Sequence, residues 1–183
     1  MKKRAISLII GLIASAGVGI YNYTDEDIVF ESGEVIEATI QPKHLTKVFG
    51  NRDVSKIKYI THHHTAGSKT QTVESIAKDQ IKRGFAEFAY HFAIYEDGSL
   101  YAVNDLEEVS WHDSGQNTNS IGIVFVGNYE NYPLSEAALN TAKELDNAIC
   151  QVLNIQGIRG HRDTSPTLCP GTFAYNQLKD VFF

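Results

Sequence analysis

The sequence of 183 residues has little of several things that would assign it to a special class of protein. Two cysteines, Cys150 and Cys169, are too few for a disulfide scaffold, although one bridge between them stays open. Its 16 Lys and Arg residues are outnumbered by 22 Asp and Glu, and a net charge of −6 argues against a nucleic-acid partner, which favours a basic face. It has no internal repeat and no low-complexity tract. These absences leave a globular chain of single-domain length, long enough to bury one core.

The sequence also lacks an apolar run long enough to span a membrane, but its N-terminus comes near to one. Lys2, Lys3 and Arg4 precede 16 uncharged residues, 5–20, whereas a spanning helix needs about 20. The basic start, the short apolar run and the small residues of "ASA" (14–16) are typical of a secretory signal peptide. An uncleaved, weakly hydrophobic anchor is the alternative, and the basic flank disfavours a buried core helix. We expect residues 1–20 to export the protein, which would be periplasmic, secreted or held at the membrane by this segment.

Residues 21–45 are rich in acidic side chains and contain no basic residue before Lys43. Like charges in a row resist compaction, so this range is expected to be a solvated linker or a loosely packed lead-in. We therefore place the globular domain at residues 46–183.

Strand and helix signals alternate along the globular part. The strand signals lie at 57–63, 90–103, 120–128 and 158–163, and the helix signals lie at 72–84, 135–152 and 174–183. Within 90–103 the pair Asp97-Gly98 predicts a hairpin turn, and the continuous apolar run after Ser120 predicts a central strand buried on both faces. The fold class is therefore α/β, with a mixed central β-sheet flanked by helices in a single domain.

Three consecutive histidines, His62, His63 and His64, stand at the end of the first predicted strand. Side chains alternate along a strand, so His63 faces one side of the sheet while its two neighbours face the other. Far along the chain, His161 and Cys169 lie eight residues apart in "GHRDTSPTLCPG". Imidazole nitrogen and thiolate are ligands that zinc prefers, and three protein ligands with one open position are typical of a catalytic site. One histidine of the run, with His161 and Cys169, would complete such a set.

Four segments together resemble a known family. "YITHHHTAG", "FAYHFAIYEDG", "WHDSGQNTNSIGIVFVGN" and "GHRDTSPTLCPG" are similar, in this order, to the zinc-dependent N-acetylmuramoyl-L-alanine amidases of type 2. This family includes phage amidase-type lysozymes and peptidoglycan recognition proteins. The resemblance runs from about residue 56 to 175, and the family fold that it implies agrees with the α/β prediction.

The resemblance implies a role for each matching residue. The zinc ligands would be His63, His161 and Cys169, and the catalytic residues would be Tyr90, before the "HF" segment, and Thr167, two residues before the cysteine. Tyr90 would donate a hydrogen bond to the developing oxyanion, and Thr167 would do the same or hold the water. Val124 stands where another branch of the family has a glutamate, so the chain resembles the tyrosine-dependent branch.

Three further residues are predicted to bind substrate, each against a plainer alternative. His64 is a packing or substrate-edge residue, His112 is loop filler or a substrate contact, and Arg162 either pairs with Asp163 or meets a peptide carboxylate. His62 and His91 are expected to be structural.

The implied activity is hydrolysis of the amide bond between N-acetylmuramic acid and L-alanine, with Zn²⁺ as cofactor and peptidoglycan or a muropeptide as partner. A peptidoglycan-binding module without catalysis is the alternative, and a structural zinc site is a third. The sequence does not distinguish a bacterial remodelling enzyme, a phage endolysin and a secreted antimicrobial effector. It also leaves the stem-peptide preference and the oligomeric state open.

Overall fold

A computed structural model describes residues 29–30, 33–38 and 43–182; the predicted signal or anchor segment 1–20 lies outside these ranges. Its centre is a seven-stranded sheet with the order β1-β2-β6-β5-β8-β4-β9. The strands are β1 (Val29–Phe30), β2 (Gly33–Glu37), β4 (Tyr59–His64), β5 (Phe92–Ile94), β6 (Leu100–Ala102), β8 (Ser120–Phe125) and β9 (Gly157–Gly160). β3 (Gly50–Asn51) and β7 (Glu108–Val109) form a separate antiparallel pair.

The middle of the sheet is parallel. β8 pairs in parallel with β5 on one side and with β4 on the other, and β4 pairs in parallel with β9. Every residue of β8 is buried, which confirms the predicted central strand. β5 and β6 are antiparallel and meet at the turn around Asp97-Gly98, so the predicted hairpin is also confirmed.

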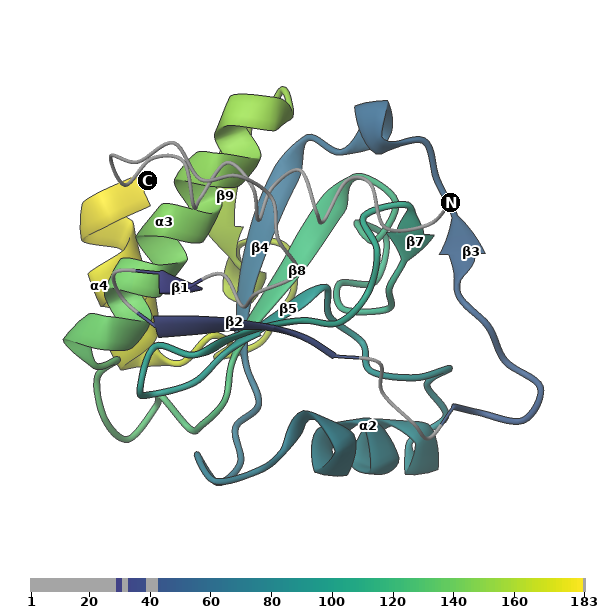
Figure 1. Cartoon of the computed structure of the whole chain (residues 1–183), viewed down its shortest axis with the longest axis horizontal. Coiled ribbons are helices and arrows are strands. Elements are labelled where there is room, and N and C mark those ends of the chain that lie inside the picture. The colour runs from purple at the N-terminus through teal and green to yellow at the C-terminus, as the bar shows by residue number, and fades with distance from the viewer. Residues whose placement is uncertain (1–28, 31–32, 39–42, 183) are drawn as a thin grey trace.

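Three helices in the described part of the chain cover the two faces of the sheet (Figure 1). α3 (Glu136–Val152) and α4 (Thr172–Phe182) pack on one face through an apolar cluster that includes Ile123 of β8. α2 (Val73–Lys82) packs on the other face, where Val73, Ile76 and Ala77 contact a cluster that includes Val124. Adjacent residues of β8 therefore serve opposite cores.

The helix ends follow local chemistry. Ser135 accepts a hydrogen bond from the backbone N–H of Ala138 and begins α3, as predicted from its position before the apolar stripe. At the start of α2, the hydroxyl of Thr72 accepts a hydrogen bond from the backbone N–H of Ser75 in the same way. Gly84 follows the end of α2 with a φ of 95°, a left-handed conformation that glycine adopts without strain.

The α/β prediction of a mixed central sheet with flanking helices in one domain is confirmed. The expected lead-in, 21–45, contains β1 and β2, and β2 pairs in parallel with β6 at the sheet edge. The like charges of this range predicted no strand, but strands at the margin of a sheet commonly carry charged residues. No helix within the described ranges is long and apolar enough to cross a membrane.

Candidate active site

The three histidines of β4 point to different surroundings. His62 is fully buried against α3, where its Nε2 lies 3.0 Å from Oδ2 of Asp146. His63 faces the other side of the sheet, beside Val124 in the paired strand β8. The predicted alternation of faces is therefore confirmed for these two residues, and it places His63, and not His62, on the face of the candidate site.

His63, His161 and Cys169 come together although the chain separates them widely. Their candidate ligand atoms all lie within 4.8 Å of one another, the one such group of three in the described part of the chain. Nδ1 of His63 lies 3.6 Å from Sγ of Cys169, and the ring centroids of His63 and His161 are 4.6 Å apart. β4 and β9 are adjacent and parallel, so their C-terminal ends bring His63 and His161 to the same edge.

The loop after β9 carries the other two residues. β9 leads into a short 3₁₀ helix, His161–Asp163, and the chain then returns so that the backbone N–H of Arg162 donates to the carbonyl of Cys169 at 2.9 Å. Sγ of Cys169 accepts a hydrogen bond from the backbone N–H of His64 at 3.3 Å. Both cysteines are free, with Cys150 exposed and Cys169 buried, so the bridge that the sequence left open is not formed.

The protonation states of this group suit a cation. Burial lowers the pKa of His63 well below its usual value, and burial also lowers the pKa of His161 against the opposing effect of Asp113. Both rings are therefore neutral at physiological pH and have a free nitrogen lone pair. Burial raises the pKa of the Cys169 thiol to about 12, so only a bound cation would make it a thiolate at neutral pH.

Tyr90 lies beside His63, two residues before the start of β5. Its ring centroid lies 5.1 Å from that of His63. Burial raises the pKa of Tyr90 above its usual value, so the hydroxyl remains a donor throughout the neutral range. Nδ2 of Asn104 donates to the backbone carbonyl of Tyr90 at 2.7 Å, which fixes the chain at this residue.

Three predicted residues surround Cys169. Thr167 is exposed and its Oγ1 accepts a hydrogen bond from the backbone N–H of Cys169 at 3.2 Å. His64 is partly buried, with Nδ1 accepting from the backbone N–H of Tyr129 at 3.2 Å, and burial lowers its pKa to about 4. The guanidinium of Arg162 lies 4.6 Å from the ring centroid of Tyr175 and donates to the carbonyl of Leu168. The substrate-binding roles of His64 and Arg162 stay predictions.

His112 lies behind the candidate ligand group, His63, His161 and Cys169, and is nearly inaccessible. It is 7% exposed, and its Nδ1 lies 3.0 Å from Nε2 of His63. Burial lowers the pKa of His112 to about 3, so this ring is neutral too. Its predicted contact with substrate stays untested, but its observed neighbour is His63.

Sequence reasoning missed the residues that hold this region together. Arg52 is 6% exposed and donates to the carbonyls of Leu106, Asn117 and Ser120, while its Nη2 lies 2.8 Å from Nε2 of His91. Nδ1 of His91 accepts from the backbone N–H of Gly122 at 3.0 Å. This network fastens the loop before β8, and no periodicity in the sequence indicated it. Asp113 was also missed; its position after His112 was the only signal.

The comparisons with known proteins agree with this geometry. Residues 53–172 match the family model Amidase_2, described as N-acetylmuramoyl-L-alanine amidase. Peptidoglycan-recognition protein SC2 of Drosophila simulans is 32% identical over 137 residues, which cover 68% of this chain and 74% of that protein.

Two solved structures have the same fold. N-acetylmuramoyl-L-alanine amidase LysC from Clostridium intestinale URNW superposes with a TM-score of 0.70 at 24% identity, covering 80% of this chain and 95% of that one. Peptidoglycan recognition protein-LE, in complex with tracheal cytotoxin, superposes with a TM-score of 0.68 at 23% identity, covering 76% of this chain and 87% of that one. At these identities the likeness shows the fold alone.

Proposed function

This chain belongs to the Amidase_2 family of N-acetylmuramoyl-L-alanine amidases, and we propose from this membership and from the site that it is a zinc-dependent hydrolase. Its substrate would be the amide bond that joins N-acetylmuramic acid to L-alanine in peptidoglycan. The observation that carries the proposal is the convergence of the His63, His161 and Cys169 donor atoms within 4.8 Å.

The donor set fits zinc. Two neutral imidazoles and one thiol that a cation would ionise are the nitrogen and sulfur ligands that zinc takes. The fourth position would be left to water, as in catalytic sites. When bound, zinc supplies hydroxide near neutral pH and polarises the amide carbonyl.

Two other residues would act, one on the substrate and one on the ligand loop, residues 161–169, which carries His161 and Cys169. Tyr90, protonated and fixed at its backbone carbonyl by Asn104, would donate its hydroxyl hydrogen bond to the carbonyl oxygen of the substrate as negative charge develops there. Thr167 would fix the loop through its hydrogen bond from the backbone N–H of Cys169. Val124 is buried in an apolar cluster beside His63, so no carboxylate base occupies that position.

Peptidoglycan or a muropeptide is the partner that the comparisons support. Peptidoglycan recognition protein-LE is described in complex with tracheal cytotoxin, a monomeric diaminopimelic acid-type peptidoglycan. On this chain His64 and Arg162 flank the ligand loop, and we propose that they contact the stem peptide.

A peptidoglycan-binding module without catalysis is the second candidate. It is favoured by the likeness to a peptidoglycan-recognition protein at 32% identity. The presence of Tyr90 next to a complete set of ligand residues supports the enzyme instead, since binding alone needs neither.

One experiment separates the two candidates. Purified protein is analysed for zinc by mass spectrometry and then incubated with purified peptidoglycan, and newly freed L-alanine amino groups are counted. The enzyme predicts one zinc per chain and release that stops on chelation and returns with added zinc. Zinc-loaded protein that sediments with peptidoglycan but frees no amino groups would establish the binding module and overturn the enzyme.

A further inference from the structure

Two consecutive residues, His112 and Asp113, reach both histidines of the ligand group from behind. They lie in the loop between β7 and β8, and they are 7% and 1% exposed. Nδ1 of His112 is 3.0 Å from Nε2 of His63, and Oδ1 of Asp113 is 3.6 Å from Nε2 of His161. One loop dipeptide therefore faces two candidate ligands, one in β4 and one directly after β9.

The contact of His112 fixes the orientation and the tautomer of His63. Nδ1 of His63 faces Sγ of Cys169, so Nε2 is the nitrogen turned away from the ligand group. If Nε2 carries the proton, it donates to Nδ1 of His112, whose own Nε2 then donates toward the carbonyl of Ser120 at 3.4 Å. The carbonyl can only accept, so this chain of hydrogen bonds has one consistent direction. It leaves the lone pair of His63 Nδ1 free for a metal.

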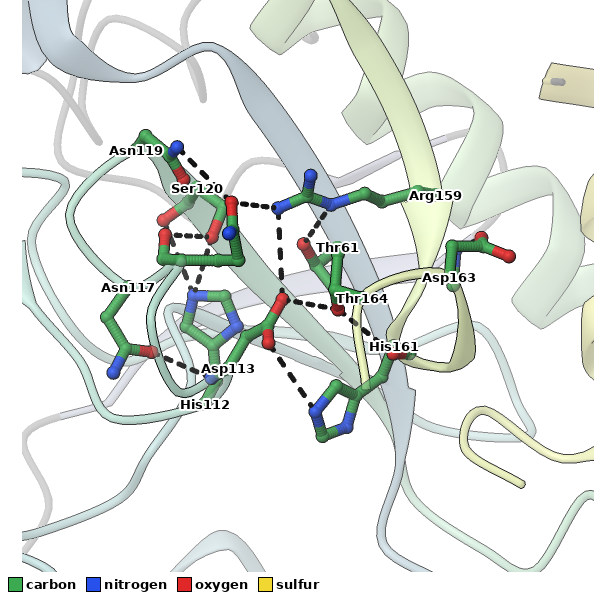
Figure 2. Close-up of polar contacts among 12 residues, drawn as sticks. Thr61, His112, Asp113, Asn117, Asn119, Ser120, Arg159, His161, Asp163 and Thr164 are labelled. Atoms are coloured by element: carbon green, nitrogen blue, oxygen red, sulfur yellow. Dashed lines mark hydrogen bonds and ion pairs between the residues drawn. The ribbon is translucent and has the colours of Figure 1, made fainter. Parts of the chain in front are cut away.

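Asp113 is held so that one carboxylate oxygen points at His161 (Figure 2). Its Oδ2 accepts from the hydroxyl of Thr164 at 2.8 Å and lies 3.8 Å from Nη2 of Arg159. Its backbone N–H donates to Oδ1 of Asn117 at 2.7 Å. Its Oδ1, by contrast, has no hydrogen-bond partner among the described residues. A buried carboxylate oxygen without a partner is costly, and the nearby ring N–H of His161 is the group that can satisfy it.

The packing of the sheet makes room for this arrangement. A Cβ atom on Gly122 of β8 would lie 2.6 Å from Cγ of His112, closer than atoms approach. The imidazole of His112 therefore lies directly on the backbone of β8, and a residue with a side chain at 122 would push it away from His63.

We infer that His112 and Asp113 are positioning residues that orient two ring ligands for the metal. His112 accepts the ring N–H of His63, and Asp113 accepts the ring N–H of His161, in each case on the side of the ring that faces away from the metal. This inference rests on the proposed zinc site. The 3.6 Å separation at Asp113 is longer than a hydrogen bond, and a small rotation of the partly exposed His161 ring would close it. Loss of such a partner typically weakens metal binding by about 10- to 100-fold.

The test measures zinc affinity by competition with a chelator in the full chain. Asp113→Asn keeps the shape and an acceptor for Thr164 but cannot offer two carboxylate oxygens, and we expect zinc binding about 10- to 100-fold weaker. His112→Leu should weaken it similarly, whereas His112→Asn, which replaces Nδ1 with an amide oxygen, should restore part of the loss. Asp97→Asn, the same change in the β5–β6 turn, is the matched control and should bind zinc as the wild type does.

Two further readouts distinguish positioning from a general structural role. With Co²⁺ in place of zinc, the absorption bands of the thiolate–cobalt site should shift in Asp113→Asn, and the melting temperature of the metal-free variant should stay near that of the metal-free wild type. If the wild-type protein binds no zinc, the proposed function itself is refuted. Wild type that binds zinc, with both Asp113→Asn and His112→Leu within threefold of its affinity, would overturn this inference alone.

Discussion

The imidazole of His62 and the carboxylate of Asp146 form a buried pair between β4 and α3. Nε2 of His62 lies 3.0 Å from Oδ2 and 3.2 Å from Oδ1 of Asp146, and both side chains are 0% exposed. His63, the next residue, belongs to the candidate ligand group on the opposite side of the sheet. Neighbouring histidines therefore lie in separate surroundings, one paired with a buried carboxylate and one in the candidate ligand group.

We predict that substitutions of these two histidines have opposite consequences. His62→Ala leaves the carboxylate of Asp146 buried without the imidazole, which should lower the free energy of unfolding by about 3 kcal/mol, while the folded fraction still binds one zinc. His63→Ala should lose most of the zinc and change the stability of the metal-free protein less. Denaturant titration and metal analysis of both variants provide the measurement.

The double substitution His62→Leu with Asp146→Leu is the control, because replacing both buried partners by apolar groups should recover much of that stability. Loss of zinc in His62→Ala together with retention in His63→Ala would show that the assignment of strand faces to roles is wrong.

Tyr90→Phe should keep both zinc and fold and lower kcat by about a hundredfold, the typical effect of losing one oxyanion donor. The hydroxyl is lost but the ring still packs 5.1 Å from His63. KM should change little, because the hydrogen bond strengthens only as charge develops. Steady-state kinetics on a soluble muropeptide give both constants, and an unchanged kcat would remove Tyr90 from the mechanism.

Thr167→Ala should reduce turnover less than Tyr90→Phe does. Its hydroxyl accepts from the backbone N–H of Cys169, so we expect it to position the ligand loop, and Thr167→Ser should retain the effect of the hydroxyl. The same kinetic assay compares the three variants. A Thr167→Ala defect as large as that of Tyr90→Phe, with zinc affinity unchanged, would instead indicate direct contact with the reacting atoms.

Glu130 should make stability depend on acid pH. Its carboxylate accepts hydrogen bonds from the hydroxyl and the backbone N–H of Thr172 at the start of α4, and these lower its pKa below the usual value. A folded-state pKa below the unfolded value means that the stabilisation is complete above about pH 4.3 and is lost as the pH falls through the folded-state pKa.

The difference in denaturation midpoint between wild type and Glu130→Gln should thus be largest near neutral pH and shrink in acid. Equilibrium unfolding at a series of pH values measures it. A difference that stays constant down to about pH 3 would mean that the charge of Glu130 does not stabilise the start of α4.

Residues 1–20 should direct export, with cleavage after Ala16 as the leading hypothesis and an attached anchor as the alternative. Residues 1–24 fused to a reporter that is active only outside the cytoplasm should give activity, and Leu12→Arg should abolish it. A shift in gel mobility distinguishes cleavage from anchoring. A silent but well-expressed reporter would contradict export and make recycled muropeptides the substrate instead of intact cell wall.

The sequence by itself determined the main elements of the sheet, its three helices and the candidate ligand residues. Alternation along β4 separated His63 from His62, because a strand turns successive side chains to opposite faces whatever the sheet around it. The apolar run of β8, the Asp97-Gly98 turn and the Ser135 cap are local signals of the same kind, and each is present in the structure. Ligand chemistry singled out His161 and Cys169, and the family resemblance selected His63 from the run and added Tyr90.

Only the tertiary structure decided which polar groups meet. His62 and Asp146 are 84 positions apart in the sequence, and Asp113 and His161 are 48 positions apart. The order of the strands and the path of the loop before β8 bring each pair together. Apolar periodicity records which face of an element is buried but not which polar side chain lies opposite. The like charges of residues 21–45 also gave no sign of β1 and β2, since pairing at the margin of a sheet depends on a neighbouring strand that local sequence does not reveal.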